Sequence, residues 1–236
     1  MLAGIFAVCC LLGAGGCGKD DAPADAPTAA DTQTAAETQA APRKDYADTA
    51  LVGNSYIDGF RIYDAMPGAS CLYRVGLSVH SVFSDPMTNG DDTNTPVIEL
   101  LKDKDYRHIF LFFGENELGW DSIDTFRSEY GDVIDTAREY CPDAAVYLVA
   151  VPPVSAAVSE KNENRTNNDN IQALNEQIQT VATDKNAVYI DSWTTLVDAN
   201  GCLPDSASAD GVHPAQDYTK KWAGLLQQAI MEGEAQ

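Results

Sequence analysis

Residues 108–113, His-Ile-Phe-Leu-Phe-Phe, decide the fold of this chain of 236 residues. After His108 the run is continuously apolar, with no alternation between apolar and polar positions. A strand that is covered on both faces has this composition, whereas a strand with one face in water alternates. The run therefore predicts an interior strand of a parallel sheet with helices on both sides.

Four shorter apolar runs complete the predicted sheet. They are Ala50–Gly53, Cys71–Val75, Ala145–Val151 and Ala187–Ile190. Helical patterns separate these runs or follow the last of them, and they cover Tyr56–Asp64, Pro96–Lys102, Ile123–Tyr140, Asn170–Thr183 and Gln216–Met231. Five strands separated by helices predict a three-layer α/β/α domain with a five-stranded parallel sheet. Such sheets place their functional sites at the carboxyl ends of the strands.

The first predicted strand ends in Gly53-Asn54-Ser55 and leads directly into a helix. A serine there presents its hydroxyl above the sheet edge, and its backbone N–H lies at a helix N-terminus, where an oxyanion is stabilised. Serine is also a favoured helix cap. The tripeptide alone supports a nucleophile and a cap equally.

Two further polar motifs follow later elements. Asn116 lies after the third strand, where its amide could donate to a developing negative charge or simply form a turn. Asp210 and His213 lie three apart before the last helix, and a nucleophilic serine needs such a base with an orienting acceptor. The other two histidines, His80 and His108, are interpreted as structural.

These motifs together resemble those of the SGNH (GDSL-type) hydrolase family. Gly53-Asn54-Ser55 matches the nucleophile motif, Gly76 and Asn116 match the second and third markers, and Asp210-Gly211-Val212-His213 matches the final Asp-x-x-His. The four motifs occur in the family's order, and the resemblance covers Asp48 to Met231.

The resemblance implies a flavodoxin-like fold and a role for each matching position. Ser55 would be the nucleophile, His213 the general base and Asp210 its orienting residue. The backbone N–H groups of Ser55 and Gly76 and the side-chain amide of Asn116 would form the oxyanion hole. No metal or cofactor is implied.

Two positions depart from the family pattern. Asn54 replaces the usual Asp before the nucleophile, and Gly114-Glu115-Asn116-Glu117 replaces the commoner Gly-x-Asn-Asp. Asparagine is nearly isosteric with aspartate and keeps an acceptor oxygen. We expect the change at Asn54 to tune activity and not to abolish it.

The predicted reaction is hydrolysis of short acyl esters, with O-acetyl groups on a carbohydrate or cell-envelope polymer as the leading substrate. The sequence has no long apolar insertion of the kind that forms a lipase lid, which disfavours long-chain lipase activity. The polar stretch Val154–Asn170 is predicted to be a loop at the site rim, and Tyr56, Trp120 and Trp193 are candidates for stacking on sugar rings. Two alternatives are a non-catalytic carbohydrate-binding lipoprotein and an O-acyltransferase. A nucleotide binder is disfavoured because no G-x-G-x-x-G phosphate loop is present.

The N-terminal region differs from the rest of the chain. Residues 1–17 are uncharged, largely apolar and too short to span a membrane, and Cys17 follows small residues as in the lipobox of bacterial lipoproteins. Residues 18–47 contain mostly Ala, Asp, Thr, Gln, Glu and Pro and are predicted to be a disordered tether. The prediction is an exported domain over 48–236, anchored to the bacterial cell membrane through a lipid on Cys17.

The net charge argues against nucleic-acid binding, and the spacing of the cysteines argues against a zinc site. The net charge of −21 repels phosphate backbones and anionic membrane surfaces, which argues against nucleic-acid binding and leaves the lipid anchor as the membrane contact. Cys71, Cys141 and Cys202 match no zinc spacing and allow at most one disulfide within the domain. The oligomeric state stays open.

Overall fold

The computed structural model describes residues 45–87 and 94–234. The expected signal peptide, Cys17 and most of the expected tether lie outside these residues. Tyr46 falls within the range predicted as tether, yet its side chain is only 1% exposed, and its backbone N–H donates to the Pro67 carbonyl at 2.8 Å. The folded region therefore includes Tyr46, two residues before Asp48.

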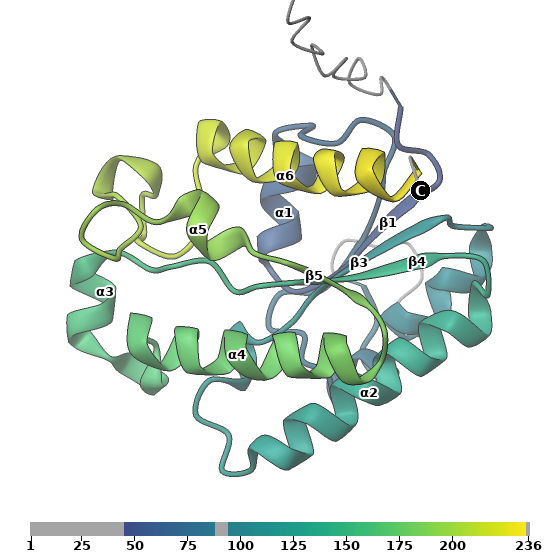
Figure 1. Cartoon of the computed structure of the whole chain (residues 1–236), viewed down its shortest axis with the longest axis horizontal. Helices are drawn as coiled ribbons and strands as arrows, with labels where there is room; N and C mark the ends of the chain where they lie inside the picture. Colours follow the sequence, from purple (N-terminus) through teal and green to yellow (C-terminus); the bar gives the residue numbers. More distant parts are fainter. Residues whose placement is uncertain (1–44, 88–93, 235–236) are drawn as a thin grey trace, which may run out of the picture. The chain divides into compact units, whose positions relative to one another are not determined.

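Five strands form one parallel sheet in the order β2-β1-β3-β4-β5, as the sequence predicted (Figure 1). The strands are β1 (Thr49–Gly53), β2 (Ser70–Tyr73), β3 (His108–Phe112), β4 (Ala145–Val149) and β5 (Val188–Ile190). β1 pairs with β2 and β3, so the carboxyl ends of these three strands are neighbours at one edge of the sheet.

Helices cover both faces of the sheet, which confirms the three-layer α/β/α class. The α-helices are α1 (Tyr56–Ile62), α2 (Ile123–Tyr140), α3 (Ala156–Lys161), α4 (Asn168–Asp184), α5 (Ser192–Leu196) and α6 (Gln216–Glu234). Short 3₁₀ helices are η1 (Ser81–Phe83), η2 (Val97–Asp103), η3 (Glu115–Glu117), η4 (Glu163–Arg165) and η5 (Asp205–Ala207). In Figure 1, α1 and α6 lie on one face and α2 and α4 on the other.

The end of β3 shows why this stretch is continuously apolar. Phe112 packs edge-on against Phe60 of α1 and Trp222 of α6, with ring centroids 5.5 and 5.4 Å apart. The next residue, Phe113, packs edge-on against Tyr130 of α2 at 5.7 Å. Successive side chains of a strand point to opposite faces, so both faces here require apolar residues.

The segment Val154–Asn170 is not a loop, which corrects the sequence-based prediction. It contains α3, η4 and the start of α4. Ser155 and Asn167 accept hydrogen bonds from the backbone N–H groups of Val158 and Asn170, at 3.3 and 2.8 Å. The polar residues that suggested a loop therefore include two helix caps. The helix predicted over Pro96–Lys102 is the 3₁₀ helix η2, and α5 was not predicted.

The three cysteines of the domain are free thiols, so the optional disulfide is not formed. Burial raises the pKa of the Cys71 thiol to about 11, which keeps it protonated at neutral pH. Among the described residues, no helix is long and apolar enough to span a membrane.

Candidate active site

Ser55 lies between β1 and α1 but does not cap the helix with its side chain. The cap comes from Asn54, whose side-chain oxygen accepts the Tyr56 backbone N–H at 3.2 Å. The turn also requires Gly53, which has φ +150°, because a Cβ there would collide with the Phe112 carbonyl. This arrangement leaves the Ser55 hydroxyl available for a different partner.

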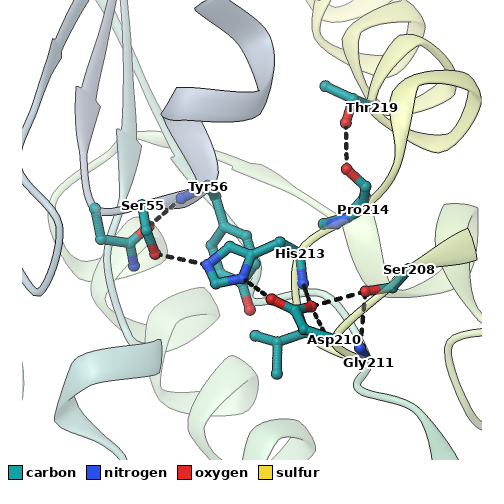
Figure 2. Close-up of polar contacts among 10 residues, drawn as sticks. Ser55, Tyr56, Ser208, Asp210, Gly211, His213, Pro214 and Thr219 are labelled. Carbon is teal, nitrogen blue, oxygen red and sulfur yellow. Dashed lines mark hydrogen bonds and ion pairs between the residues drawn. The ribbon is translucent and has the colours of Figure 1, made fainter. Parts of the chain in front are cut away.

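That partner is His213, 158 residues away in the sequence. Figure 2 shows the imidazole between Ser55 and Asp210, with Nε2 2.9 Å from Ser55 Oγ and Nδ1 2.7 Å from Asp210 Oδ2. An ionised carboxylate only accepts hydrogen bonds, so the proton of a neutral His213 is on Nδ1. Nε2 then accepts the hydrogen bond that the Ser55 hydroxyl donates, which is the geometry of a serine with its general base.

Asp210 is held in place by three further donors. Its Oδ1 accepts the backbone N–H groups of Val212 and His213 and the Ser208 hydroxyl, at 2.9, 2.8 and 2.9 Å. Partial burial tends to raise the pKa of Asp210, but the hydrogen bonds from His213, Val212 and Ser208 outweigh this effect and place the pKa well below its usual range. Asp210 is therefore ionised throughout the neutral range and can stabilise a protonated His213.

The turn that carries Asp210 and His213 is hydrogen-bonded to Ser155, which caps α3, and to Thr219 of α6. Gly211 has φ +80°, its carbonyl accepts the Ser155 backbone N–H at 2.8 Å, and an added Cβ would collide with the Ser155 hydroxyl. On the other side, Thr219 Oγ1 donates to the Pro214 carbonyl at 2.9 Å. The tertiary structure thus fixes the turn at both ends.

Tyr56 supports the imidazole from behind and is not a sugar-stacking residue. Its ring lies 5.5 Å from His213 and 5.5 Å from Trp222, and it is only 4% exposed (Figure 2). Trp120 and Trp193, the other two stacking candidates, are partly exposed. Trp120 lines a cavity of about 240 Å³ between α2 and α4.

The loops after β2 and β3 carry the two remaining motif residues. Gly76 is exposed at φ +79°, and the Asn116 side-chain amide donates to the Leu77 carbonyl at 2.9 Å. This bond joins the two loops, whose strands flank β1. One N–H of the Asn116 amide nitrogen is used in it, and a second remains on the same atom. The fold therefore brings Ser55, Gly76 and Asn116 to the ends of three adjacent strands.

Glu117 is a buried residue of the same region that the sequence motifs did not single out. Its carboxylate is hydrogen-bonded to the backbone N–H groups of Gly114 and Val79, at 2.8 and 2.6 Å, and it is 2% exposed. Burial raises the pKa of Glu117 to about 7, against the lowering effect of these hydrogen bonds. A glutamate three residues after a helix cap is typical of a capping box, which was the available signal.

The two histidines predicted to be structural do not take part in the Ser55–His213–Asp210 cluster. His80 forms a surface pair with Glu129 at 3.0 Å. His108 is buried, with Nδ1 3.2 Å from the Tyr147 hydroxyl. Within residues 45–87 and 94–234, no group of three or more His, Cys, Asp or Glu side chains is arranged to hold a metal ion.

A scan against protein families matches residues 51–217 to the model of the GDSL-like Lipase/Acylhydrolase family. Among solved structures, the chain is similar to a GDSL-like lipase from Bacteroides thetaiotaomicron, with 17% identity, a TM-score of 0.58, and coverage of 78% of this chain and 88% of that one.

Two further similar structures are carbohydrate esterases. A carbohydrate acetylesterase from Sinorhizobium meliloti has 9% identity, a TM-score of 0.55, and coverage of 80% of this chain and 99% of that one. A carbohydrate esterase of family 3 from Talaromyces cellulolyticus has 15% identity, a TM-score of 0.52, and coverage of 78% and 96%. These identities establish the shared fold. A search of curated proteins finds no significant match.

Proposed function

We propose that this chain, which belongs to the GDSL-like lipase/acylhydrolase family, is an ester-hydrolysing enzyme that works through an acyl-enzyme on Ser55. The family establishes the class of enzyme. The observation that carries the serine mechanism is the chain of hydrogen bonds from Ser55 Oγ through His213 to Asp210, at 2.9 and 2.7 Å.

In the proposed reaction, Ser55 Oγ attacks the ester carbonyl while His213 Nε2 takes its proton. Asp210 stabilises the resulting imidazolium. The backbone N–H groups of Ser55 and Gly76, with the side-chain amide of Asn116, donate to the oxyanion. Collapse of the tetrahedral intermediate expels the alcohol, which leaves with the proton from His213, and a water molecule then releases the acid by the same steps.

The test is hydrolysis of an aryl acetate, with fluorophosphonate labelling of the same preparations. Ser55→Ala should lower the rate by about 10³–10⁶ and abolish labelling. Ser128→Ala, a substitution of an exposed serine on α2, is the matched control and should retain both. An unchanged rate in Ser55→Ala would contradict the assignment, and an unlabelled wild-type protein would favour a carbohydrate binder without catalysis.

The proposed substrate is a short acyl group, chiefly acetyl, on a carbohydrate or cell-envelope polymer. Two observations support it: carbohydrate esterases share this fold, and the partly exposed Trp120 and Trp193 offer ring faces for sugars. Rates should fall along a series of aryl acetate, butyrate and palmitate, and acetylated oligosaccharides should release acetate. Transfer of acetyl to an added sugar in preference to water would identify an O-acyltransferase instead.

For the location of the enzyme, we propose an exported lipoprotein with its lipid on Cys17. The support is the apolar stretch before Cys17 and the polar segment after it. Metabolic labelling with a radioactive fatty acid in a bacterial host tests this, because Cys17→Ser should abolish labelling and release the protein from the membrane fraction. Labelling that persists in Cys17→Ser would contradict the proposal.

A further inference from the structure

The proposed oxyanion donors Gly76 and Asn116 lie on two separate loops, and a buried carboxylate joins these loops. Glu117 Oε2 accepts the Gly114 backbone N–H at 2.8 Å, and Oε1 accepts the Val79 backbone N–H at 2.6 Å. Gly114 lies two residues before Asn116, and Val79 lies three residues after Gly76. The side chain therefore connects the loop after β3 to the loop after β2.

The contact with Val79 is distant in sequence and is not a simple helix cap. The bond to Gly114 satisfies the backbone N–H of the residue that caps η3, which is the ordinary role of a glutamate at this position. The bond to Val79 spans 38 residues. With the bond from Asn116 to the Leu77 carbonyl, it gives the two loops two links across the end of β1.

We propose that Glu117 is a positioning residue of the active site, whose ionised carboxylate fixes the distance between the two loops that supply the oxyanion donors. This inference rests on the proposed function for the identity of those donors. Oxyanion donors must lie about 2.7–3.1 Å from the developing charge, so a small change in loop spacing lowers transition-state stabilisation.

The protonation state of Glu117 sets the strength of both bonds. An ionised carboxylate accepts each N–H in a charge-assisted hydrogen bond, whereas a protonated carboxyl is neutral and a weaker acceptor, most of all at the oxygen that carries the hydrogen. Burial raises the pKa of Glu117 to about 7, with a smaller contribution from the charge of Glu115. Tyr130 on α2 also interacts with it electrostatically, and Arg165 lines the cavity between α2 and α4 that Glu117 lines too. Loss of the ionised form on acidification should therefore loosen the loops.

Activity and stability should depend on this protonation in opposite directions. Protonation removes a buried charge and therefore favours the folded state. It also weakens the bonds that join the loops and should lower the rate of the chemical step. A purely structural role would predict activity that is unaffected by this titration while the protein stays folded.

The experiment compares kcat, KM and their pH profiles for the wild type, Glu117→Gln and Glu117→Asp. Glu117→Gln has one acceptor oxygen and no charge, so kcat for an aryl acetate should fall about 10–100-fold, with KM changed less than about threefold. Glu117→Asp keeps the charge but is one methylene shorter, and its kcat should lie between the two. Glu139→Gln, which removes an exposed acidic charge from α2, is the matched control and should behave as the wild type.

The acid limb of the kcat profile gives a second readout. The wild-type rate should fall more steeply on acidification than the rate of Glu117→Gln, because only the wild type loses the Glu117 carboxylate. A Glu117→Gln enzyme with wild-type kcat and an unchanged acid limb overturns the inference. If this variant does not fold, a Glu117→Asp enzyme with wild-type kcat and an unchanged acid limb overturns it. Failure of the proposed function is distinguishable, because Ser55→Ala would then remain active.

Discussion

The side-chain oxygen of Asn54 accepts the backbone N–H of Tyr56, so that Asn54 and not Ser55 caps helix α1 with its side chain. Asn54 therefore caps the helix, and the adjacent Ser55 bonds to His213. Asn54 satisfies an N–H of the first helical turn. The hydroxyl of Ser55 is left to donate to His213 at 2.9 Å.

Substitutions at Asn54 test this division. Asn54→Ala removes the capping oxygen and should lower the free energy of unfolding by about 1–2 kcal/mol, measured by urea denaturation. It should also lower kcat several-fold, because Ser55 begins the same helical turn. Asn54→Asp keeps an acceptor oxygen beside a helix N-terminus, where a negative charge is favoured. Its activity should stay within about threefold of the wild type, and a loss as large as that of Asn54→Ala would contradict the capping role.

Asp210→Asn should leave substrate binding almost unchanged and lower kcat by about 10²–10⁴. The amide that replaces Oδ2 donates to Nδ1 of His213, which places the imidazole proton on Nε2 and removes the base facing Ser55. Steady-state kinetics with an aryl acetate measures this effect. Asp205→Asn, an exposed substitution in η5, serves as the control and should retain the wild-type rate.

The turn at Gly211 can be tested against a glycine of the same backbone conformation. Gly211 and Gly201 have φ of +80° and +77°, so alanine at either position costs about 1 kcal/mol in backbone strain. An added Cβ at Gly201 meets no atom within 4 Å, whereas at Gly211 it collides with the Ser155 hydroxyl. Thermal unfolding and kcat should show a greater loss of stability in Gly211→Ala and a loss of activity in that variant alone. Equal effects of the two substitutions would exclude a special role for this contact.

The stability of the protein should depend on pH through the titration of Glu117. Its pKa rises from the ordinary value of 4.5 to about 7 on folding. Between these pH values the folded chain binds a proton that the unfolded chain does not, so the contribution of Glu117 to stability falls as pH rises. The loss amounts to about 3 kcal/mol at about 1.4 kcal/mol per pKa unit. Urea denaturation at pH 5 and pH 8 should show that Glu117→Gln gains stability relative to the wild type at the higher pH. A constant difference between the two proteins would contradict this pKa.

Most of the fold followed from the sequence because its signals are local. The five strands were predicted from continuous apolar runs, and α2 was predicted with its observed bounds, because its apolar residues recur at spacings of three and four. The segment Val154–Asn170 was misassigned for the opposite reason. Its helices are short and polar, and Ser155 and Asn167 act as caps, which composition alone does not separate from loop residues.

The candidate triad could also be predicted from the sequence, since Ser55, Asp210 and His213 lie in short motifs at predicted element ends. The contacts that support the triad could not be predicted. Tyr56 behind His213 and Ser155 under Gly211 depend on how distant elements pack. No spacing of residues along the chain predicts such contacts.

Local physics therefore determined the class of fold, the order of its elements and the residue types present at the strand ends. These depend on hydrophobic periodicity and on turn chemistry, which act over a few residues. Only the folded chain decided that Ser55 bonds His213 and not its own helix, and that Glu117 joins two loops. Both outcomes require groups 158 and 38 residues apart to meet at hydrogen-bond distance, which the packing of helices on a parallel sheet brings about.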